Sequence, residues 1–441
     1  MTALKRLRKI GLMECYHSTR HYLGLDSCVV SAAQYTTQDG LALTKEILFP
    51  ALRTVIETHS ALGLQLDGDE ATTNVYLVRL PSIDLSQMVK FSDKENVQEA
   101  FEAQLVRRFE TQSDLPLWRV EVLADNTVIF ALHHTIGDGM SSMVFHLSLF
   151  KALQNARSGD STSIVAVPTD TVPVPPIDST TSLRPSLSTI ASSIYKEFVP
   201  VAWTKAHLTW TGPASPSTPD LKTRIRLMTF SAADVVAFCA AARAHDATLT
   251  STMYVVAITV LSRMLANDPA GYTHIAGGVA ISLRGVAGIP EDAFCDYPSL
   301  WPGSPRVSSD FSWPEAARVA GTLRAQKREG REIIGMLRFL CGQFVPFMKA
   351  HLGAKRGVGF CVSNLGRVQT PELEGRWTIG RTMFAQCDVV VAAAFNINVC
   401  GDPTGGLNIT FSWGETCIDA GFVEGFIADF QKEFQQVIAP K

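Results

Sequence analysis

The residues with the clearest chemical potential are two adjacent histidines, His133 and His134, followed by Asp138 and Gly139. Chance supplies these residue types at this spacing in on the order of one chain in a thousand of this length. The motif directly follows an apolar run, 127–132, with the residue types of a β-strand. It therefore places a titratable imidazole where a strand gives way to a helix, and this position predicts an enzyme.

A neutral imidazole near pH 7 can accept a proton from a hydroxyl and return it to a leaving thiol. Because alternate side chains of a strand point to opposite faces, we expect one histidine to face a cleft and the other the interior. Three interpretations of Asp138 are open: it orients the histidine, it caps the following helix, or it pairs with a distant arginine. Gly139 lacks a side chain where a ligand would approach the backbone.

Other kinds of site have weaker support. A metal bound by the motif would have a poor ligand geometry, and Cys15, His17 and His21 are more simply explained as unpaired residues. A purely structural histidine pair is a further alternative. The chain has no GxSxG, Walker A or GxGxxG sequence, so covalent serine catalysis, nucleotide phosphate binding and a Rossmann dinucleotide site lack support. We expect general base catalysis without a protein nucleophile, a metal or a bound cofactor.

Composition places the chain among ordinary globular proteins. Its net charge of −3 gives no indication of binding to nucleic acid or to an anionic membrane. No signal-peptide h-region is apparent, and no apolar run approaches the ~20 residues that cross a bilayer. The nine cysteines have no CxxC spacing, which favours reduced thiols. We expect a monomer in the cytoplasm.

The elements that must position the motif alternate between helix and strand. Two β-rich runs, 118–123 and 127–132, predict a hairpin, and the apolar stripe in 140–150 predicts a helix after the motif. Residues 157–189 are rich in Ser, Thr and Pro and predict a loop or crossover, and 208–220 predicts a linker. Beyond the linker a similar mix restarts, with strands expected at 223–230, 275–283, 357–362, 389–399 and 407–413.

The His-His-x-x-x-Asp-Gly motif resembles the signature of the acyltransferase superfamily that depends on coenzyme A. This superfamily includes chloramphenicol acetyltransferases, the plant BAHD enzymes and the condensation domains of nonribosomal peptide synthetases. The BAHD motif Asp-Phe-Gly-Trp-Gly is absent, and 411–414 is a superficial echo of it. Four further stretches, spread over about 350 residues, are similar to the fungal and yeast alcohol acetyltransferase family: Leu12–Tyr16, Leu117–Arg119, Ile281–Arg284 and Ser363–Gly366.

The resemblance implies an α/β fold built from two-layer sandwiches. Two chloramphenicol-acetyltransferase-like domains with mainly antiparallel sheets, over 1–207 and 221–441 with a linker at 208–220, would enclose an active-site tunnel between them. It also implies that His134 is the general base, which deprotonates a hydroxyl or amine. The acceptor would then attack an acyl thioester directly, without an acyl-enzyme, and acyl-CoA such as acetyl-CoA would be the co-substrate.

The resemblance also implies roles for neighbouring residues. Asp138 would be structural and paired with an arginine, for which Arg284 is the candidate. His133 would hold the loop, and Gly139 would keep the tunnel open for the pantetheine arm. Two residues, Ser363 and Asn364, are candidates for oxyanion or substrate contacts, although a turn that caps a strand explains them as well. Weaker candidates, which fit the core or the tunnel wall, are Tyr16, Ser412 and Trp413.

The substrates are less well defined than the reaction. The many apolar residues suit a small apolar alcohol such as a terpenoid, polyketide or fatty alcohol, although ordinary core composition explains them equally well. One alternative is a condensation-type or offloading catalyst whose acyl donor is bound to a carrier protein. Another is an inactive descendant that only binds a ligand, and the intact histidine pair argues against it.

Overall fold

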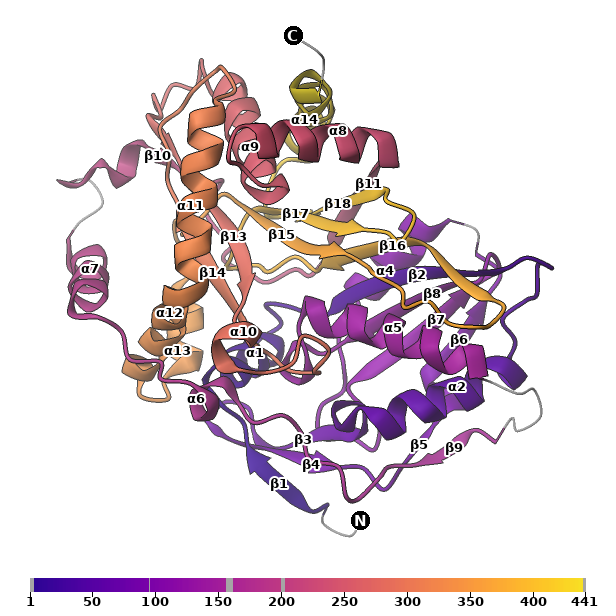
Figure 1. Ribbon diagram of the computed structural model, residues 1–441. Helices are drawn as coiled ribbons and strands as arrows, with labels where there is room; N and C mark the ends of the chain where they lie inside the picture. Colours follow the sequence, from indigo (N-terminus) through magenta and orange to yellow (C-terminus); the bar gives the residue numbers. More distant parts are fainter. Residues whose placement is uncertain (1–3, 95, 156–161, 200–202, 439–441) are drawn as a thin grey trace.

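Two large β-sheets form the framework of the molecule (Figure 1). The computed structural model describes residues 4–94, 96–155, 162–199 and 203–438. Within them, one sheet has the strand order β16-β2-β8-β7-β6 and the other the order β11-β18-β17-β15-β13-β14. Six of the nine strand pairings in these two sheets are antiparallel. The expected α/β fold with mainly antiparallel sheets is confirmed.

The first sheet carries the histidine motif at the end of β8. Its β7 and β8 form the predicted hairpin, in which Trp118 pairs with Leu132 and Val122 with Val128. Every residue of both strands is buried, so the end of β8 lies inside the molecule. The strands of this sheet are β2 (Val29–Thr37), β6 (Val89–Ser92), β7 (Trp118–Leu123), β8 (Thr127–Leu132) and β16 (Trp377–Gln386).

The second sheet comes entirely from the C-terminal half of the chain. The strand expected at 389–399 begins only at Phe395, because the carbonyls of Val390 and Ala392 accept hydrogen bonds from the Arg356 guanidinium, at 2.7 and 2.8 Å. The strands of this sheet are β11 (Thr223–Phe230), β13 (Gly277–Ser282), β14 (Pro298–Gly303), β15 (Phe360–Arg367), β17 (Phe395–Gly401) and β18 (Leu407–Gly414).

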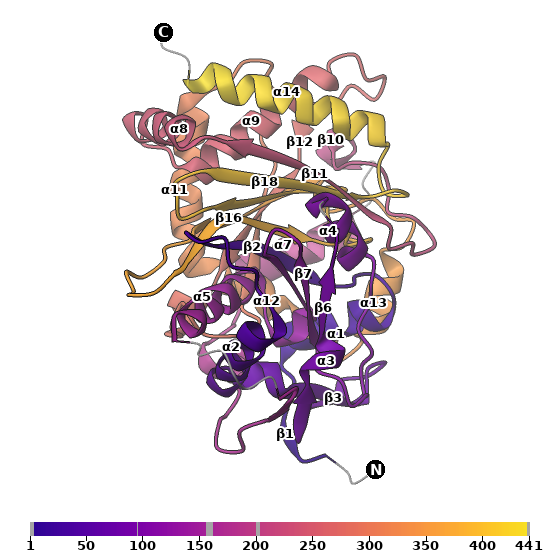
Figure 2. The same cartoon turned by 90° about the vertical axis from the view of Figure 1, so that its right-hand side faces the viewer.

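Helices cover the outer side of each sheet. Figure 2 shows α8, α9 and α14 outside the second sheet and α2 and α5 outside the first. In α14, Phe426, Phe430 and Phe434 recur every four residues, so they lie on one helix face and are fully buried. The covering helices are α2 (Lys45–Thr58), α5 (Gly139–Asn155), α8 (Ala232–Ala244), α9 (Leu249–Met264) and α14 (Ala420–Ile438).

Shorter elements complete the fold. The predicted crossover over 157–189, of which 157–161 lie outside the described residues, contains a short strand and a helical turn before α7. The remaining strands are β1 (Arg6–Lys9), β3 (Leu64–Asp69), β4 (Asn74–Arg79), β5 (Ser82–Asp84), β9 (Ile164–Ala166), β10 (Thr209–Trp210) and β12 (His274–Ile275). The remaining α-helices are α1 (Leu12–Tyr22), α3 (Leu85–Met88), α4 (Val97–Leu105), α6 (Ile177–Thr180), α7 (Leu187–Phe198), α10 (Arg284–Ala287), α11 (Trp313–Glu329), α12 (Arg331–Met336) and α13 (Phe344–Ala350).

One strand joins the two halves of the chain. β16, which lies in the C-terminal half of the sequence, pairs antiparallel with β2 from Gln386 opposite Val29 to Trp377 opposite Thr37. It also contacts β17 and β18 of the second sheet. The first sheet is thus completed by a strand from beyond the predicted linker. The domain boundaries at 207 and 221 stay predictions, and this sheet contains strands from both predicted domains.

In the described part of the chain no single helix is long and apolar enough to cross a bilayer. Two sharply bent helix pairs, 232–264 and 331–350, pass by length and composition alone.

The shared strand makes a prediction about fragments. A fragment of residues 1–207 lacks β16 and leaves the backbone groups of β2 unpaired along an apolar edge. We expect it to aggregate or to unfold without cooperativity, as judged by circular dichroism and size-exclusion chromatography. Co-expression with residues 208–441 should restore a cooperative transition. A fragment that is monomeric and unfolds cooperatively by itself would show that the predicted N-terminal domain is independent of β16.

Candidate active site

The two histidines of the motif face different surroundings. β8 ends at Leu132, and the His133 ring is completely buried, 4.3 Å from the ring of His21. Its Nδ1 accepts a hydrogen bond from the backbone N–H of Thr135, at 3.1 Å. Burial holds the pKa of His133 well below its usual value, so the ring is neutral. His134, on the following 3₁₀ turn, keeps a side chain that is 14% exposed.

Asp138 both caps a helix and forms an ion pair. Its Oδ1 accepts a hydrogen bond from the backbone N–H of Ser141, at 3.0 Å, in the first turn of α5. Its two oxygens also accept bidentate hydrogen bonds from Arg284, at 2.7 and 2.8 Å. Burial raises the pKa of Asp138, but the charge and hydrogen bonds of Arg284 outweigh it, so the net pKa is lowered. The helix cap and the arginine partner, two of the three interpretations of Asp138, therefore both occur in the structure.

Arg284 connects the motif to a segment of the second half. Its side chain is fully buried, and Nη2 donates to the carbonyl oxygens of Ala293 and Cys295 as well as to Asp138. Asp138 Oδ2 in turn lies 3.4 Å from the backbone nitrogen of Tyr297, which donates to it. The irregular segment between α10 and β14 is thereby fixed against the histidine motif.

This segment delivers a residue that the sequence analysis missed. The carboxylate of Asp296 is buried between two imidazoles: Oδ2 lies 2.6 Å from Nδ1 of His17, and Oδ1 lies 3.2 Å from Nδ1 of His134. The second contact is at ion-pair distance but too oblique for a well-aligned hydrogen bond. The His17 and His134 rings stack with their centroids 3.7 Å apart. No spacing rule links these three residues, and in the sequence His17 stands out only by its closeness to Cys15 and His21.

The cluster has the electrostatics of a carboxylate shared by two rings. Burial raises the pKa of Asp296, but the two histidines outweigh it and hold the pKa well below its usual value. Burial lowers the pKa of His17 to about 4. Burial also lowers the pKa of His134, but Asp296 outweighs this effect and the net pKa is raised. Of the two rings, His134 is therefore the one that holds a proton more readily.

The same three residues are the described group whose atoms could surround a metal ion. Their ligand atoms lie within 4.8 Å of one another. The hydrogen bond between His17 and Asp296 and the ion-pair contact between Asp296 and His134 already explain that proximity without a metal. Cys15 and His21, by contrast, have other partners: Cys15 lies 3.9 Å from the Ile10 carbonyl oxygen, and the backbone N–H of Phe109 donates to His21.

His134 borders two cavities. The larger has a volume of about 730 Å³ and is lined from both halves of the chain, with Tyr16, His17 and Arg20 on one side and Pro298, Phe347 and Val389 among the others. The smaller, of about 80 Å³, is lined by His134, Gly139, Ser363 and Asn364. A Cβ atom at Gly139 would lie 2.9 Å from the side chains of Leu365 and Phe384. The imidazole therefore stands where two ligands could meet.

The structure brings together some of the other predicted residues. Ser363 lines the smaller cavity, whereas the Asn364 side chain donates to Thr250 Oγ1 and accepts from the backbone N–H of Gly366, as in the turn interpretation. Tyr16 lines the larger cavity. Ser412 and Trp413 do not reach either cavity, because every residue of β18 is buried in the second sheet. Ser412 accepts a hydrogen bond from Asn398, and Trp413 packs in the core.

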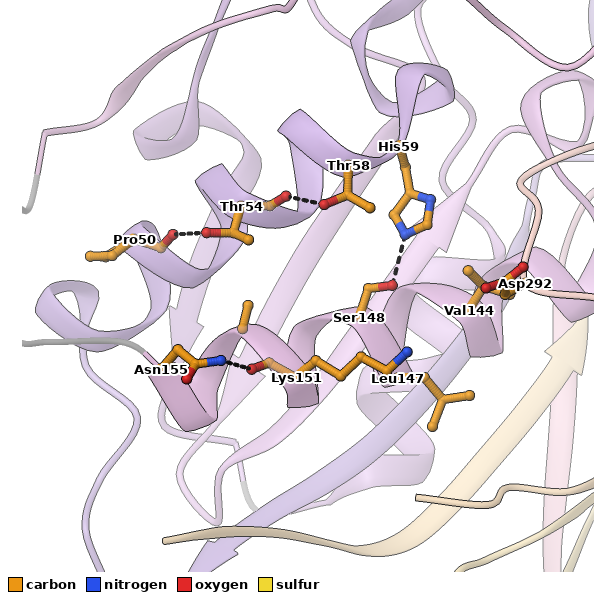
Figure 3. Close-up of a pocket in the computed structure, with 11 residues that line it drawn as sticks. Pro50, Thr54, Thr58, His59, Val144, Leu147, Ser148, Lys151, Asn155 and Asp292 are labelled. Carbon is orange, nitrogen blue, oxygen red and sulfur yellow. Dashed lines mark hydrogen bonds between the residues drawn. The ribbon is translucent and has the colours of Figure 1, made fainter. Parts of the chain in front are cut away.

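A further cavity lies between α2 and α5, away from the motif (Figure 3). It contains a hydrogen bond of 2.7 Å between His59 Nε2 and Ser148 Oγ, with Lys151 and Asp292 at its border. Burial lowers the pKa of His59 to about 4. Ser148 lies in the middle of α5, where the backbone N–H groups bond within the helix, so they cannot form an oxyanion hole beside its hydroxyl. None of the predicted site residues borders it.

Comparison with known proteins defines the class. The family model described as Alcohol acetyltransferase matches residues 9–293 and 330–434. The chain therefore belongs to the alcohol acetyltransferase family, as its resemblance predicted, and it is an acyltransferase. Acyl-CoA is the co-substrate that this family implies.

Relatives of similar length come from filamentous fungi. The chain is 24% identical over 468 residues to Probable alcohol acetyltransferase FCK4 of Fusarium pseudograminearum, covering 96% of this chain and 94% of the relative. It is also 24% identical over 475 residues to Probable alcohol acetyltransferase crmB of Aspergillus fumigatus, covering 97% and 99%.

Solved structures share the fold at low sequence identity. Trichothecene 15-O-acetyltransferase from Fusarium sporotrichioides superposes with a TM-score of 0.68 at 12% identity, covering 98% of this chain and 95% of that one. The condensation domain of the Monacolin K polyketide synthase MokA gives 0.65 at 12% identity, covering 99% and 98%. These similarities show the fold alone, and they confirm the two-part acyltransferase fold.

The buried ion pair makes a prediction about stability. Asp138→Ala leaves the Arg284 charge buried without its carboxylate, so we expect a loss of about 3–5 kcal/mol in the free energy of unfolding. Asp429→Ala removes an exposed ion pair of α14 and should cost only about 0–1 kcal/mol. Denaturant unfolding measures both. Equal effects of the two substitutions would contradict the structural role of Asp138.

The lowered pKa of Asp138 sets the pH range of this contribution. A carboxylate with a depressed folded-state pKa stabilises the protein fully above its unfolded value, about pH 4, and loses this effect as the pH falls further. The stability difference between the wild type and Asp138→Ala should therefore be constant near neutral pH and shrink in acid. A difference that grows in acid would be the wrong sign for this pair.

Proposed function

We propose that the protein transfers an acyl group, in the simplest case acetyl, from acyl-CoA to a hydroxyl of a small apolar alcohol, with His134 as the general base. The observation that carries this proposal is the position of His134 at the junction of a large and a small cavity. Its Nδ1 faces Asp296, so Nε2 is the nitrogen left for a substrate. Two substrates that enter from different sides would meet at this atom.

The reaction follows from these positions. His134 Nε2 takes the proton of the acceptor hydroxyl as its oxygen attacks the thioester carbonyl carbon. The tetrahedral intermediate collapses with cleavage of the carbon–sulfur bond, and the imidazolium returns the proton to the departing thiolate. An ester and free coenzyme A are the products. The Ser363 hydroxyl is the candidate donor to the oxyanion, because Ser363 lines the smaller cavity together with His134.

The neighbouring residues have supporting roles in this proposal. His133 is neutral and buried, and its hydrogen bond to Thr135 shapes the turn that presents His134. Asp138 faces Arg284 and acts structurally. Gly139 leaves space in the smaller cavity, which suits the narrow pantetheine arm. The only cation that borders the larger cavity within the described residues is Arg20, which pairs with Asp26 at 2.7 Å, so this cavity suits the acceptor better than the CoA phosphates.

The residues that line the larger cavity support an acceptor that is mainly apolar and carries oxygen atoms. Apolar residues form most of its wall, and those of α12, α13 and the 389–393 segment are among them. The wall also includes Ser188, Ser192 and Ser193 of α7, a helix whose first turn is hydrogen-bonded to Glu332 of α12. About 730 Å³ accommodates an acceptor of drug-like size. We infer that the acceptor is an oxygenated secondary metabolite, such as a terpenoid or polyketide alcohol.

A carrier-protein thioester is the second candidate donor. The fold similarity to the MokA condensation domain favours it, because condensation domains share this architecture. The family match to alcohol acetyltransferases favours free acyl-CoA. Nine free thiols in the chain suit the reducing cytoplasm, where we propose that the enzyme works as a monomer.

The base assignment predicts the effect of one substitution. His134→Ala should lower acyl transfer at least about 10²-fold, because the substitution removes the proton acceptor while the turn is still held by His133. Release of coenzyme A from acetyl-CoA, followed with a thiol reagent across a panel of alcohols, measures the rate. The unfolding midpoint serves as a control for folding. Folded His134→Ala with wild-type turnover would refute the assignment.

The acceptor assignment predicts a change of selectivity. Ser192→Leu replaces a hydroxyl of the cavity wall, for which the described residues provide no partner, by an apolar group. We expect kcat/KM for oxygenated acceptors to fall by about tenfold relative to simple apolar alcohols. Val236→Ser, on the exposed surface of α8, is a control that should change neither. Uniform loss against all acceptors would count against α7 as part of the acceptor site.

A further inference from the structure

A general base needs only one imidazole, but His134 lies in a cluster with two further buried residues, Asp296 and His17. Each oxygen of one buried carboxylate faces Nδ1 of a different imidazole, at 2.6 and 3.2 Å. The three residues come from the α1 helix, the motif and the irregular segment before β14. A carboxylate with no exposed surface is stable only where charges and donors compensate it. The two rings supply this compensation here.

We propose that Asp296 is a positioning residue for His134, and that His17 holds Asp296 in place for this task. The proposal rests on the proposed function, since it concerns the base of that reaction. It assigns a role to two residues that lie outside the motif.

The tautomers follow from the chemistry of the carboxylate. An ionised carboxylate only accepts hydrogen bonds, so the Nδ1 atoms that face Asp296 carry the protons. In His134 this leaves the lone pair on Nε2, the nitrogen that must take the proton of the acceptor. When Nε2 is protonated during turnover, the imidazolium lies beside a fixed negative charge. Closer alignment of the oblique contact at 3.2 Å would strengthen this effect in the substrate complex.

His17 is a support and not a second base. Burial is the main cause that lowers its pKa, to about 4. At neutral pH the His17 ring therefore stays uncharged and does not compete with His134 for the proton. Its Nδ1–H occupies one carboxylate oxygen at 2.6 Å, which restrains the rotation of Asp296. Its ring stacks on that of His134 at 3.7 Å, which restrains the rotation of the imidazole.

Other charged groups near the cluster have partners of their own. Arg20 lowers the pKa of His134 and Asp26 raises it, and these two residues form an ion pair at 2.7 Å. Further titratable groups that act on the cluster are a carboxylate paired with Arg8, the carboxylate paired with Arg284, a neutral imidazole and a thiol whose pKa burial raises: Glu14, Asp138, His133 and Cys295. Asp296 is the carboxylate in direct contact with His134.

The first test is Asp296→Asn, with activity measured against pH. Without the carboxylate, we expect kcat to fall at least about 10²-fold with little change in the KM for the acceptor, because proton transfer and not binding is affected. The acidic limb of kcat/KM should move to lower pH, because the residue that raises the pKa of the base is gone. The matched control is Asp388→Asn, a buried carboxylate that contacts Cys417 and no histidine, which should leave the profile unchanged.

The second test separates a held carboxylate from simple packing. His17→Gln keeps an N–H donor for Asp296, whereas His17→Phe keeps a stacked ring without the donor. We expect His17→Gln to retain activity within about tenfold and His17→Phe to lose at least about tenfold more, the effect of losing one charge-assisted hydrogen bond. The reverse order would mean that the stacked ring and not the hydrogen bond is what matters, and would overturn the role given to His17.

A measurement without substrate keeps this proposal distinct from the proposed function. NMR titration of the His134 ring protons in the wild type and in Asp296→Asn reports its pKa directly, and we expect a lower pKa in the variant. If no CoA ester is consumed by the wild type but this shift is observed, the proposed function fails while the positioning role of Asp296 stands. An unchanged His134 pKa in folded Asp296→Asn overturns the proposal, whatever the activity.

Discussion

The buried ion pair between Asp138 and Arg284 is the constraint on which the site depends. It joins the first turn of α5 to a segment of the second half, and Arg284 Nη2, which binds Asp138, also donates to carbonyl groups of that segment. Asp296 is carried on this segment, so the geometry around His134 depends on an interaction that does not touch the imidazole. A charge pair of this kind contributes little net stability compared with apolar packing, but it fixes the relative position of two parts of the chain.

The motif and its arginine were predictable because each is marked by local sequence. His133, His134 and Asp138 lie within six residues, and Arg284 lies in a stretch that resembles the family. His17 and Asp296 were not predictable in the same way. They lie 279 positions apart and meet only through the packing of α1 against the loop before β14. Ser412 and Trp413, the weaker candidates, lie in the core, one of the two places that the sequence predicted for them, because their strand is fully buried.

The fold shows where periodicity fails as a signal. The strands over 223–230 and 407–413 were predicted within a residue of their ends, because their residues are β-rich and their pairing is regular. β16 was missed because its register against β2 shifts between Ile379 and Thr382, which interrupts the alternation of inward and outward residues. This strand joins the two halves through its pairing with β2. The sequence pattern therefore did not predict a pairing on which the architecture depends.

The placement of α7 has a consequence for how this protein can change over time. The helix comes from the crossover, lies outside both sheets, and contributes several small polar side chains to the wall of the larger cavity. Its other side exposes Leu187, Ile194 and Phe198 to solvent, so little of the core depends on it. Substitutions in this helix can alter which molecules fit without disturbing the elements that hold the imidazole. Selection for a new ligand of the larger cavity could therefore act on one surface element while the residues around His134 stay under a separate constraint.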